Sequence, residues 1–138
     1  MIFDLQTLLS NAQAITASAA STNIIDLGPI APGGIVRDIG KGREVPLRIQ
    51  VVEAFNNLTS LTIDIQTDDN TGFSSPATVI SRTIPLAQLT AGYVDVIEEF
   101  TRKTNERYVR LNYTVTGTAP TTGKITAGVT MGNQSNAE

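Results

Sequence analysis

The chain has 138 residues, a length that suits one domain with its own core. It contains no Cys, His or Trp, which excludes disulfides, thiolate or imidazole zinc sites, and Cys–His or Ser–His catalytic machinery. Ten basic and 13 acidic side chains give a formal net charge of -3, so no overall positive field attracts nucleic acid or anionic lipid.

The first 22 residues are predicted to form an extended N-terminal arm. The apolar positions at its start are Phe3, Leu5, Leu8 and Leu9. These positions also suit an amphipathic helix, but residues 15–22 are β-branched or small, which favours the arm. Asp4 interrupts the first apolar run, so a secretory signal is not expected. No apolar run reaches the roughly 18 to 20 residues that cross a bilayer, so no membrane contact is expected.

A short strand is expected at residues 23–27, followed by a Pro- and Gly-rich loop at 28–44. Gly33–Gly34 and Gly40–Lys41–Gly42 suggest a phosphate-binding loop. The spacing does not fit the motif, because five residues rather than four separate Gly34 from Gly40. In addition, Gly42 stands where the motif needs a Ser or Thr to bind magnesium. The loop is therefore interpreted as an exposed connection that orders on contact with a partner or packs on its own subunit.

Apolar and polar residues alternate with a period of two in most of the remaining chain. Strands are predicted over 45–51, 61–65, 79–80, 93–97, 108–116 and 124–131. We expect the first two to pair across a bend at 54–57, and the last two to form a hairpin across the turn at 118–123. Between the strands at 79–80 and 93–97, Pro85 with Leu86 and Leu89 suggests one buried helical turn or a packed loop. The polar residues 133–138 are expected to be a frayed tail.

These elements predict an all-β fold, an antiparallel β-sandwich or jelly roll with an extended N-terminal arm. The sandwich domain is expected over residues 23–132, between the arm at 1–22 and the tail at 133–138. With only four Phe and three Tyr, its core must consist mainly of Val, Ile and Leu.

Two carboxylate pairs are candidates for chemistry. Asp68–Asp69–Asn70 offers hard oxygen ligands for calcium, but Asp and Asn also close turns through backbone amides, and a turn between two strands is the preferred interpretation. Glu98 and Glu99 directly follow the predicted strand 93–97; neighbours in extended chain point to opposite faces, so this pair cannot flank one scissile bond. No metal or cofactor is expected.

Tyr108, Arg110 and Asn112 share one face of a predicted strand, an arrangement that suits base stacking with phosphate contacts. The surrounding sequence mixes charges: Arg102, Lys103, Arg107 and Arg110 lie among Glu98, Glu99 and Glu106. Ion pairing between strands is therefore the favoured role, and no direct binding of nucleic acid is expected.

Three segments resemble a known family. They are residues 13–28 (QAITASAASTNIIDLG), 61–69 (LTIDIQTDD) and 106–117 (ERYVRLNYTVTG). They are similar to the capsid cement (decoration) proteins of tailed bacteriophages, and the resemblance extends from the N-terminal arm to residue 128. It implies a jelly-roll protein without enzymatic activity that binds the outer surface of a mature phage head.

The resemblance also implies the partners. The protein would clasp neighbouring copies of the major capsid protein and would itself be a homo-oligomer, with dimers favoured and trimers as the alternative. The candidate contact residues in the arm and loop are Phe3, Leu5, Leu8, Leu9, Ile35, Arg37, Lys41 and Arg43. Each of these residues has the alternative of packing on its own subunit.

Two other classes of function stay open. The first is a carbohydrate- or receptor-binding module on the virion, since jelly rolls often present loops to sugars. Sugar sites usually need aromatic platforms, and this chain has only Tyr93, Tyr108 and Tyr113 to offer, of which the strand pattern buries one. The second is an enzyme limited to Asp, Glu, Lys, Ser and Tyr chemistry.

Overall fold

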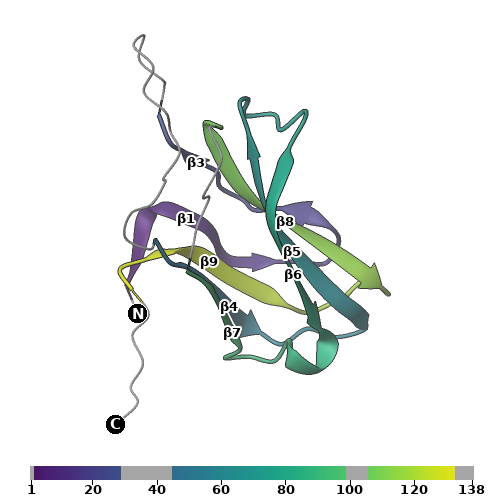
Figure 1. Ribbon diagram of the computed structural model, residues 1–138. Coiled ribbons are helices and arrows are strands. Elements are labelled where there is room, and N and C mark those ends of the chain that lie inside the picture. Colours follow the sequence, from purple (N-terminus) through teal and green to yellow (C-terminus); the bar gives the residue numbers. More distant parts are fainter. Residues whose placement is uncertain (1, 29–44, 99–105, 133–138) are drawn as a thin grey trace.

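The computed structural model describes residues 2–28, 45–98 and 106–132, which form two antiparallel β-sheets packed face to face (Figure 1). The first sheet has the order β1-β9-β4-β7, with β1 at Phe3–Ala14, β9 at Lys124–Thr130, β4 at Leu47–Glu53 and β7 at Val94–Ile97. The second has the order β2-β8-β5-β6, with β2 at Ala19–Ala20, β8 at Tyr108–Gly117, β5 at Leu58–Asp68 and β6 at Ala77–Pro85. The predicted all-β sandwich is confirmed.

Two short elements complete the described fold. Strand β3, Ile25–Asp26, also pairs with β8. The 3-10 turn η1, Leu86–Gln88, follows β6 and leads into Leu89, which is buried in the core. The sequence predicts a buried helical turn or a packed loop after Pro85; the helical turn is present, but none of its own residues is buried. No helix within the described ranges is long and apolar enough to cross a membrane.

The core lies between the sheets and is built from the alternating residues that defined the strands. Its largest fully buried side chains are Leu9, Ile15, Leu47, Ile49, Leu58, Leu61, Ile63, Ile65, Leu89, Leu111, Tyr113 and Ile125. Aliphatic residues dominate, as the composition requires. Tyr113 is the exception, and its hydroxyl lies 2.8 Å from the Ser10 Oγ of β1, so a hydrogen bond joins the two sheets through the core.

Both predicted hairpins are wrong, because each pair of strands is divided between the two sheets. β4 lies in the first sheet and β5 in the second, while β8 lies in the second sheet and β9 in the first. The bend at 54–57 and the turn at 118–123 are therefore corners at which the chain changes sheets. A period of two identifies strands but carries no information on which strands pair.

The two corners are bonded to each other. The Asn56 amide accepts hydrogen bonds from the backbone N–H groups of Thr121 and Thr122 and donates one to the Thr121 hydroxyl. Gly123 adopts a φ of +134°, and a Cβ at this position would overlap the Phe55 ring. The Phe55 ring thus occupies the space that any other residue at 123 would need.

The expected N-terminal arm is extended, but it does not stand apart from the domain. Residues 3–14 form β1, an edge strand of the first sheet that pairs with β9. The close approach of the two strands depends on Gly128, where a Cβ would lie 3.0 Å from the Leu8 Cα. The predicted boundary at residue 22 is corrected: the first strand of the sandwich begins at Phe3.

Asp68 closes the turn between β5 and β6. One carboxylate oxygen accepts a hydrogen bond from the Asn70 N–H at 3.1 Å, and the other accepts one from the Ser75 N–H at 2.9 Å. These hydrogen bonds, with that of Ser75 the most important, hold the pKa of Asp68 below its usual value. The geometry gives Asp68 a role in the turn, the interpretation preferred from the sequence.

We predict that Gly123→Ala destabilises the fold through the corner contact. The substitution requires both a backbone conformation that side chains avoid and displacement of the Phe55 ring. Gly132→Ala is the matched control, since Gly132 has a similar φ of +127° but nothing within 4 Å of an added Cβ. Denaturant unfolding should show Gly123→Ala less stable than this control by about 2 kcal/mol or more, and equal stabilities would contradict the corner contact.

Asp68→Asn is expected to lower stability at neutral pH and to flatten its decline in acid. Because folding lowers the pKa of Asp68, the carboxylate stabilises the fold above the unfolded value of about 3.8 and loses this effect as pH falls below it. Unfolding free energies between pH 7 and pH 3 measure the difference. Asp64→Asn on the outer face of β5 makes the same chemical change away from the turn, and a response matching that of Asp68→Asn would refute the assignment.

Candidate interaction surface

A bulge of several residues interrupts the first half of β1. Phe3 pairs with Thr130 and Leu8 with Gly128, so residues 4–7 lie opposite the single residue Val129. The Asp4 carboxylate closes the bulge by accepting hydrogen bonds from the Gln6 N–H at 3.3 Å and the Thr7 hydroxyl at 2.9 Å. Bulges of this kind turn side chains in directions that a regular strand does not allow.

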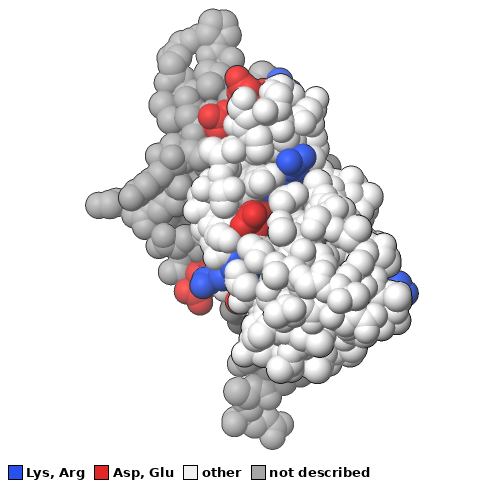
Figure 2. Space-filling model, turned by 90° about the vertical axis from the view of Figure 1, so that its right-hand side faces the viewer, with Lys and Arg blue, Asp and Glu red and all other residues white. Residues whose placement is uncertain are grey.

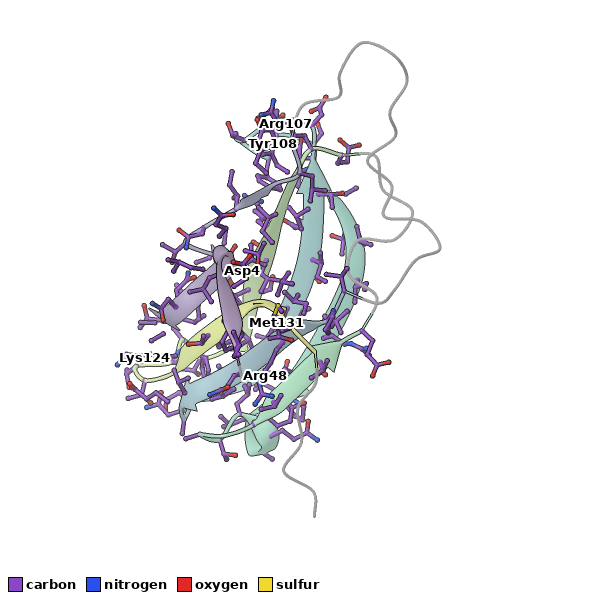
Figure 3. All side chains as sticks on the ribbon, turned by 90° about the vertical axis from the view of Figure 1, so that its left-hand side faces the viewer. Asp4, Arg48, Arg107, Tyr108, Lys124 and Met131 are labelled. Carbon is purple, nitrogen blue, oxygen red and sulfur yellow. The ribbon has the colours of Figure 1, made fainter. Side chains whose placement is uncertain are left out.

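The bulge presents Leu5 to solvent. This side chain is 83% exposed, and it lines a shallow groove with Gln6, Leu8, Thr22, Asn23 and Ile24. Ile24 is also exposed, and Ile2 and Met131 lie beyond the Phe3–Thr130 pair as two further exposed apolar residues. Figure 3 looks onto this side of the molecule, with Asp4 and Met131 labelled. We call Ile2, Leu5, Ile24 and Met131 the apolar edge.

The second half of β1 is covered by its own chain. The Asn23 backbone N–H donates to the Leu9 carbonyl at 3.0 Å, and the Asn23 side-chain amide donates to the Leu8 carbonyl at 3.0 Å. The Gln13 amide donates to the Ala20 carbonyl and accepts from the Thr22 N–H. The open part of the strand is therefore limited to the bulge that carries Leu5.

The structure separates the predicted contact residues into three groups. Leu5 is exposed, Phe3 and Leu8 are half-buried, and Leu9 is fully buried in the core. Leu9 is thus corrected from a contact candidate to a core residue, because the strand directs it between the sheets. Ile35, Arg37, Lys41 and Arg43, together with the glycines at 33, 34, 40 and 42, lie outside the described residues.

Three residues of the apolar edge were not identified from the sequence. Ile24 and Ile25 are neighbours, and only one of two adjacent strand residues can face the core; Ile25 does so. Met131 continues the alternation of β9, but the strand ends at Thr130 and Met131 is 82% exposed. Ile2 precedes β1, so it belongs to no alternating pattern from which its exposure could be predicted.

Arg107, just before β8, and Arg110, within it, have partners within the chain. The Arg107 guanidinium forms a two-bond ion pair with Asp26 of β3, at 2.7 and 2.8 Å, and this pair raises the pKa of Arg107. Arg110 lies over the Phe73 ring, with 4.2 Å from its guanidinium carbon to the ring centroid, and donates to Gln66. Arg107 thus forms an ion pair with a neighbouring strand, whereas Arg110 contacts an aromatic ring and a neutral amide rather than a carboxylate.

The face shown in Figure 2 offers no concentrated charge for a ligand. Figure 2 shows acidic and basic side chains scattered over the face that it presents, without a large patch of one sign. No group of three or more Asp or Glu residues in the described ranges is arranged to hold a metal ion. Leu5 and Met131, at 83% and 82% exposed, are the most exposed large apolar side chains of the described residues, and they make this edge the candidate surface for contact with a partner.

Comparison with known proteins supports a phage-associated chain. No curated protein matches it. The crystal structure of the PBSX exported protein XepA, a phage protein, is similar with a TM-score of 0.50 and 15% identity, a likeness that concerns the fold. The alignment covers 95% of this chain and 38% of that chain. The family model Bbp16 matches residues 9–129, and because this range is most of the sequence, the chain belongs to the Bbp16 family.

Proposed function

We propose that this protein is a structural capsid cement (decoration) protein without catalytic activity. It binds the outer surface of the phage head and bridges neighbouring subunits of the major capsid protein, which stabilises the mature shell. The observation that carries the proposal is the exposed Leu5 on a bulge closed by Asp4, in a phage-associated family. The resemblance of the sequence to cement proteins supports the same role.

The bulge suits a docking role because its shape does not depend on burying Leu5. Polar contacts of Asp4 within the bulge hold the backbone, so the apolar side chain stays extended in solution. Full burial of a leucine side chain contributes roughly 1.5 to 3 kcal/mol. A recess on a capsid subunit would gain that contribution without first reshaping the strand.

A cement protein needs only modest affinity at each contact. Its copies act on a repeating lattice, where simultaneous contacts raise the overall affinity well above that of one site. The apolar edge is small, which fits a contact of this kind. A homo-oligomer, with a dimer favoured over a trimer, would multiply the contacts further.

The carbohydrate-binding alternative gains no support from the described aromatic residues. Tyr113 is fully buried and bonded to Ser10. Tyr108 is half-buried, and its ring faces the Arg107 guanidinium at 5.0 Å. Tyr93 is half-buried and packs against the core. An open aromatic platform for a sugar ring is not formed by these three side chains.

Heads that lack the protein are expected to release DNA at a lower temperature than complete heads. Purified protein added back to such heads should restore the release temperature, because the lattice contacts would form again. A DNA-binding dye that cannot enter intact heads measures this effect, because its fluorescence rises when heating releases the DNA. Equal release temperatures with and without the protein would contradict the stabilising role.

Leu5→Ser is expected to weaken binding to protein-free heads by about tenfold or more, since it removes the apolar contact. The fold should be unaffected, because the side chain is exposed. Val52→Ser is the matched control: Val52 is a partly exposed apolar residue towards the other end of the first sheet. Sedimentation of labelled protein with heads gives both affinities, and an unchanged affinity for Leu5→Ser would exclude this docking site.

A further inference from the structure

The groove beside Leu5 lies where two segments of the chain separate. Residues 22–24 run along the edge of β1, and the Asn23 N–H donates a hydrogen bond to the Leu9 carbonyl. Beyond this bond β1 forms its bulge, and no hydrogen bond joins Ile24 to β1. The groove is the space between the two segments, and it is lined by Leu5, Gln6, Leu8, Thr22, Asn23 and Ile24.

Ile24 directs its backbone groups towards this groove. The next residue, Ile25, pairs with Val109 of β8. The Leu27 N–H donates to the Arg107 carbonyl, so the backbone groups of residues 25 and 27 point towards β8. Because these groups alternate in direction along an extended chain, those of Ile24 point the other way. Neither its N–H nor its carbonyl has a hydrogen-bond partner among the described residues, and this donor and acceptor are the groups that an added strand engages.

The side chains of the groove favour an uncharged, apolar occupant. Leu5 and Ile24 are 83% and 38% exposed, so both have apolar surface to cover. None of the six lining residues is charged, and the nearby Asp4 carboxylate is bonded within the bulge. A charged side chain entering this groove would lose hydration without gaining an opposite charge.

The free edges of β6 and β7 suit such an occupant less well. Their large apolar residues are buried or half-buried, whereas those beside the groove are exposed. Arg82 of β6 and Asp95 of β7 lie 3.9 Å apart and already balance each other within one copy. A register shift also interrupts the pairing of β6 with β5. Among the edges of the described sandwich, the groove thus combines free backbone groups with exposed apolar side chains.

We infer that the groove takes an extended segment of the major capsid protein. This segment pairs with the backbone of Ile24 and places an uncharged, apolar side chain against Leu5 and Ile24. The inference rests on the proposed function and names the chemistry of the partner at that site. Backbone pairing would fix the direction of the segment, and the apolar contact would supply much of the affinity.

Hydrogen exchange read by mass spectrometry tests the backbone contact on heads that lack the protein. The Ile24 N–H should exchange rapidly in the free protein and about tenfold or more slowly on heads. The Thr71 N–H is the control, because it is exposed in the turn after β5 and also lacks a described partner; its exchange should not change. Failure to bind heads would overturn the proposed function and the inference together, whereas binding with unchanged exchange at Ile24 would overturn the inference alone.

An ester bond separates the role of the backbone from that of the side chain. Replacing Ile24 by its α-hydroxy acid analogue removes the N–H, keeps the side chain and breaks no hydrogen bond within the described chain. Affinity for heads should fall about fivefold, and the matching ester at Thr71 should leave it unchanged. Equal affinities for the two esters would overturn the strand pairing. Protection of Ile24 in the purified protein alone, rising with concentration, would identify a second copy as the occupant and would overturn the assignment to the capsid protein.

A pair of charge variants tests the uncharged character of the segment. Thr22 is exposed, and its backbone N–H rather than its side chain is bonded, to Gln13, so Thr22→Lys and Thr22→Glu should both fold. Both should bind heads several times more weakly, with Thr71→Lys and Thr71→Glu correcting for long-range charge effects. Tighter binding by either Thr22 variant, after this correction, would overturn the assignment to an uncharged segment.

Discussion

The architecture depends on the contact between two corners at one end of the sandwich. The Phe55 ring fills the place of a side chain at Gly123, and the Asn56 amide joins the backbone of both corners. Each corner carries the chain from one sheet to the other, and together they place β9 beside β4. β9 in turn is the strand on which β1 forms. The bulge that exposes Leu5 therefore depends on a contact at the far end of its partner strand.

The molecule combines a packed core with an exposed apolar edge. The bulge in β1 presents apolar side chains held by polar contacts, which suits a recess on another protein. The hydrogen bond between Ser10 and Tyr113 connects β1, which carries the bulge, to the second sheet through the core. This arrangement fits a protein that holds large neighbours together.

The strands were predictable from the sequence, and their partners were not. Alternation located β4, β5, β8 and β9 to within a few residues, because side chains on opposite faces meet opposite environments. The hairpin predictions failed because the roles of Asn56 and Gly123 appear only when the two corners meet. At the candidate site, the sequence identified Leu5 as a contact candidate but could not separate it from Leu9. Their difference arises from the bulge between them, for which the only local signal is Asp4 preceding Gln6 and Thr7 at turn spacing.

The central claim concerns where the protein resides in the virion, and its copy number tests that claim most directly. Quantitative mass spectrometry of purified virions gives the ratio of this protein to the major capsid protein. The cement function predicts a ratio near or somewhat below one, since the protein would occupy the head lattice throughout. A ratio of a few per cent would assign it to a tail, vertex or fibre, and its absence from virions would contradict a structural role in the head.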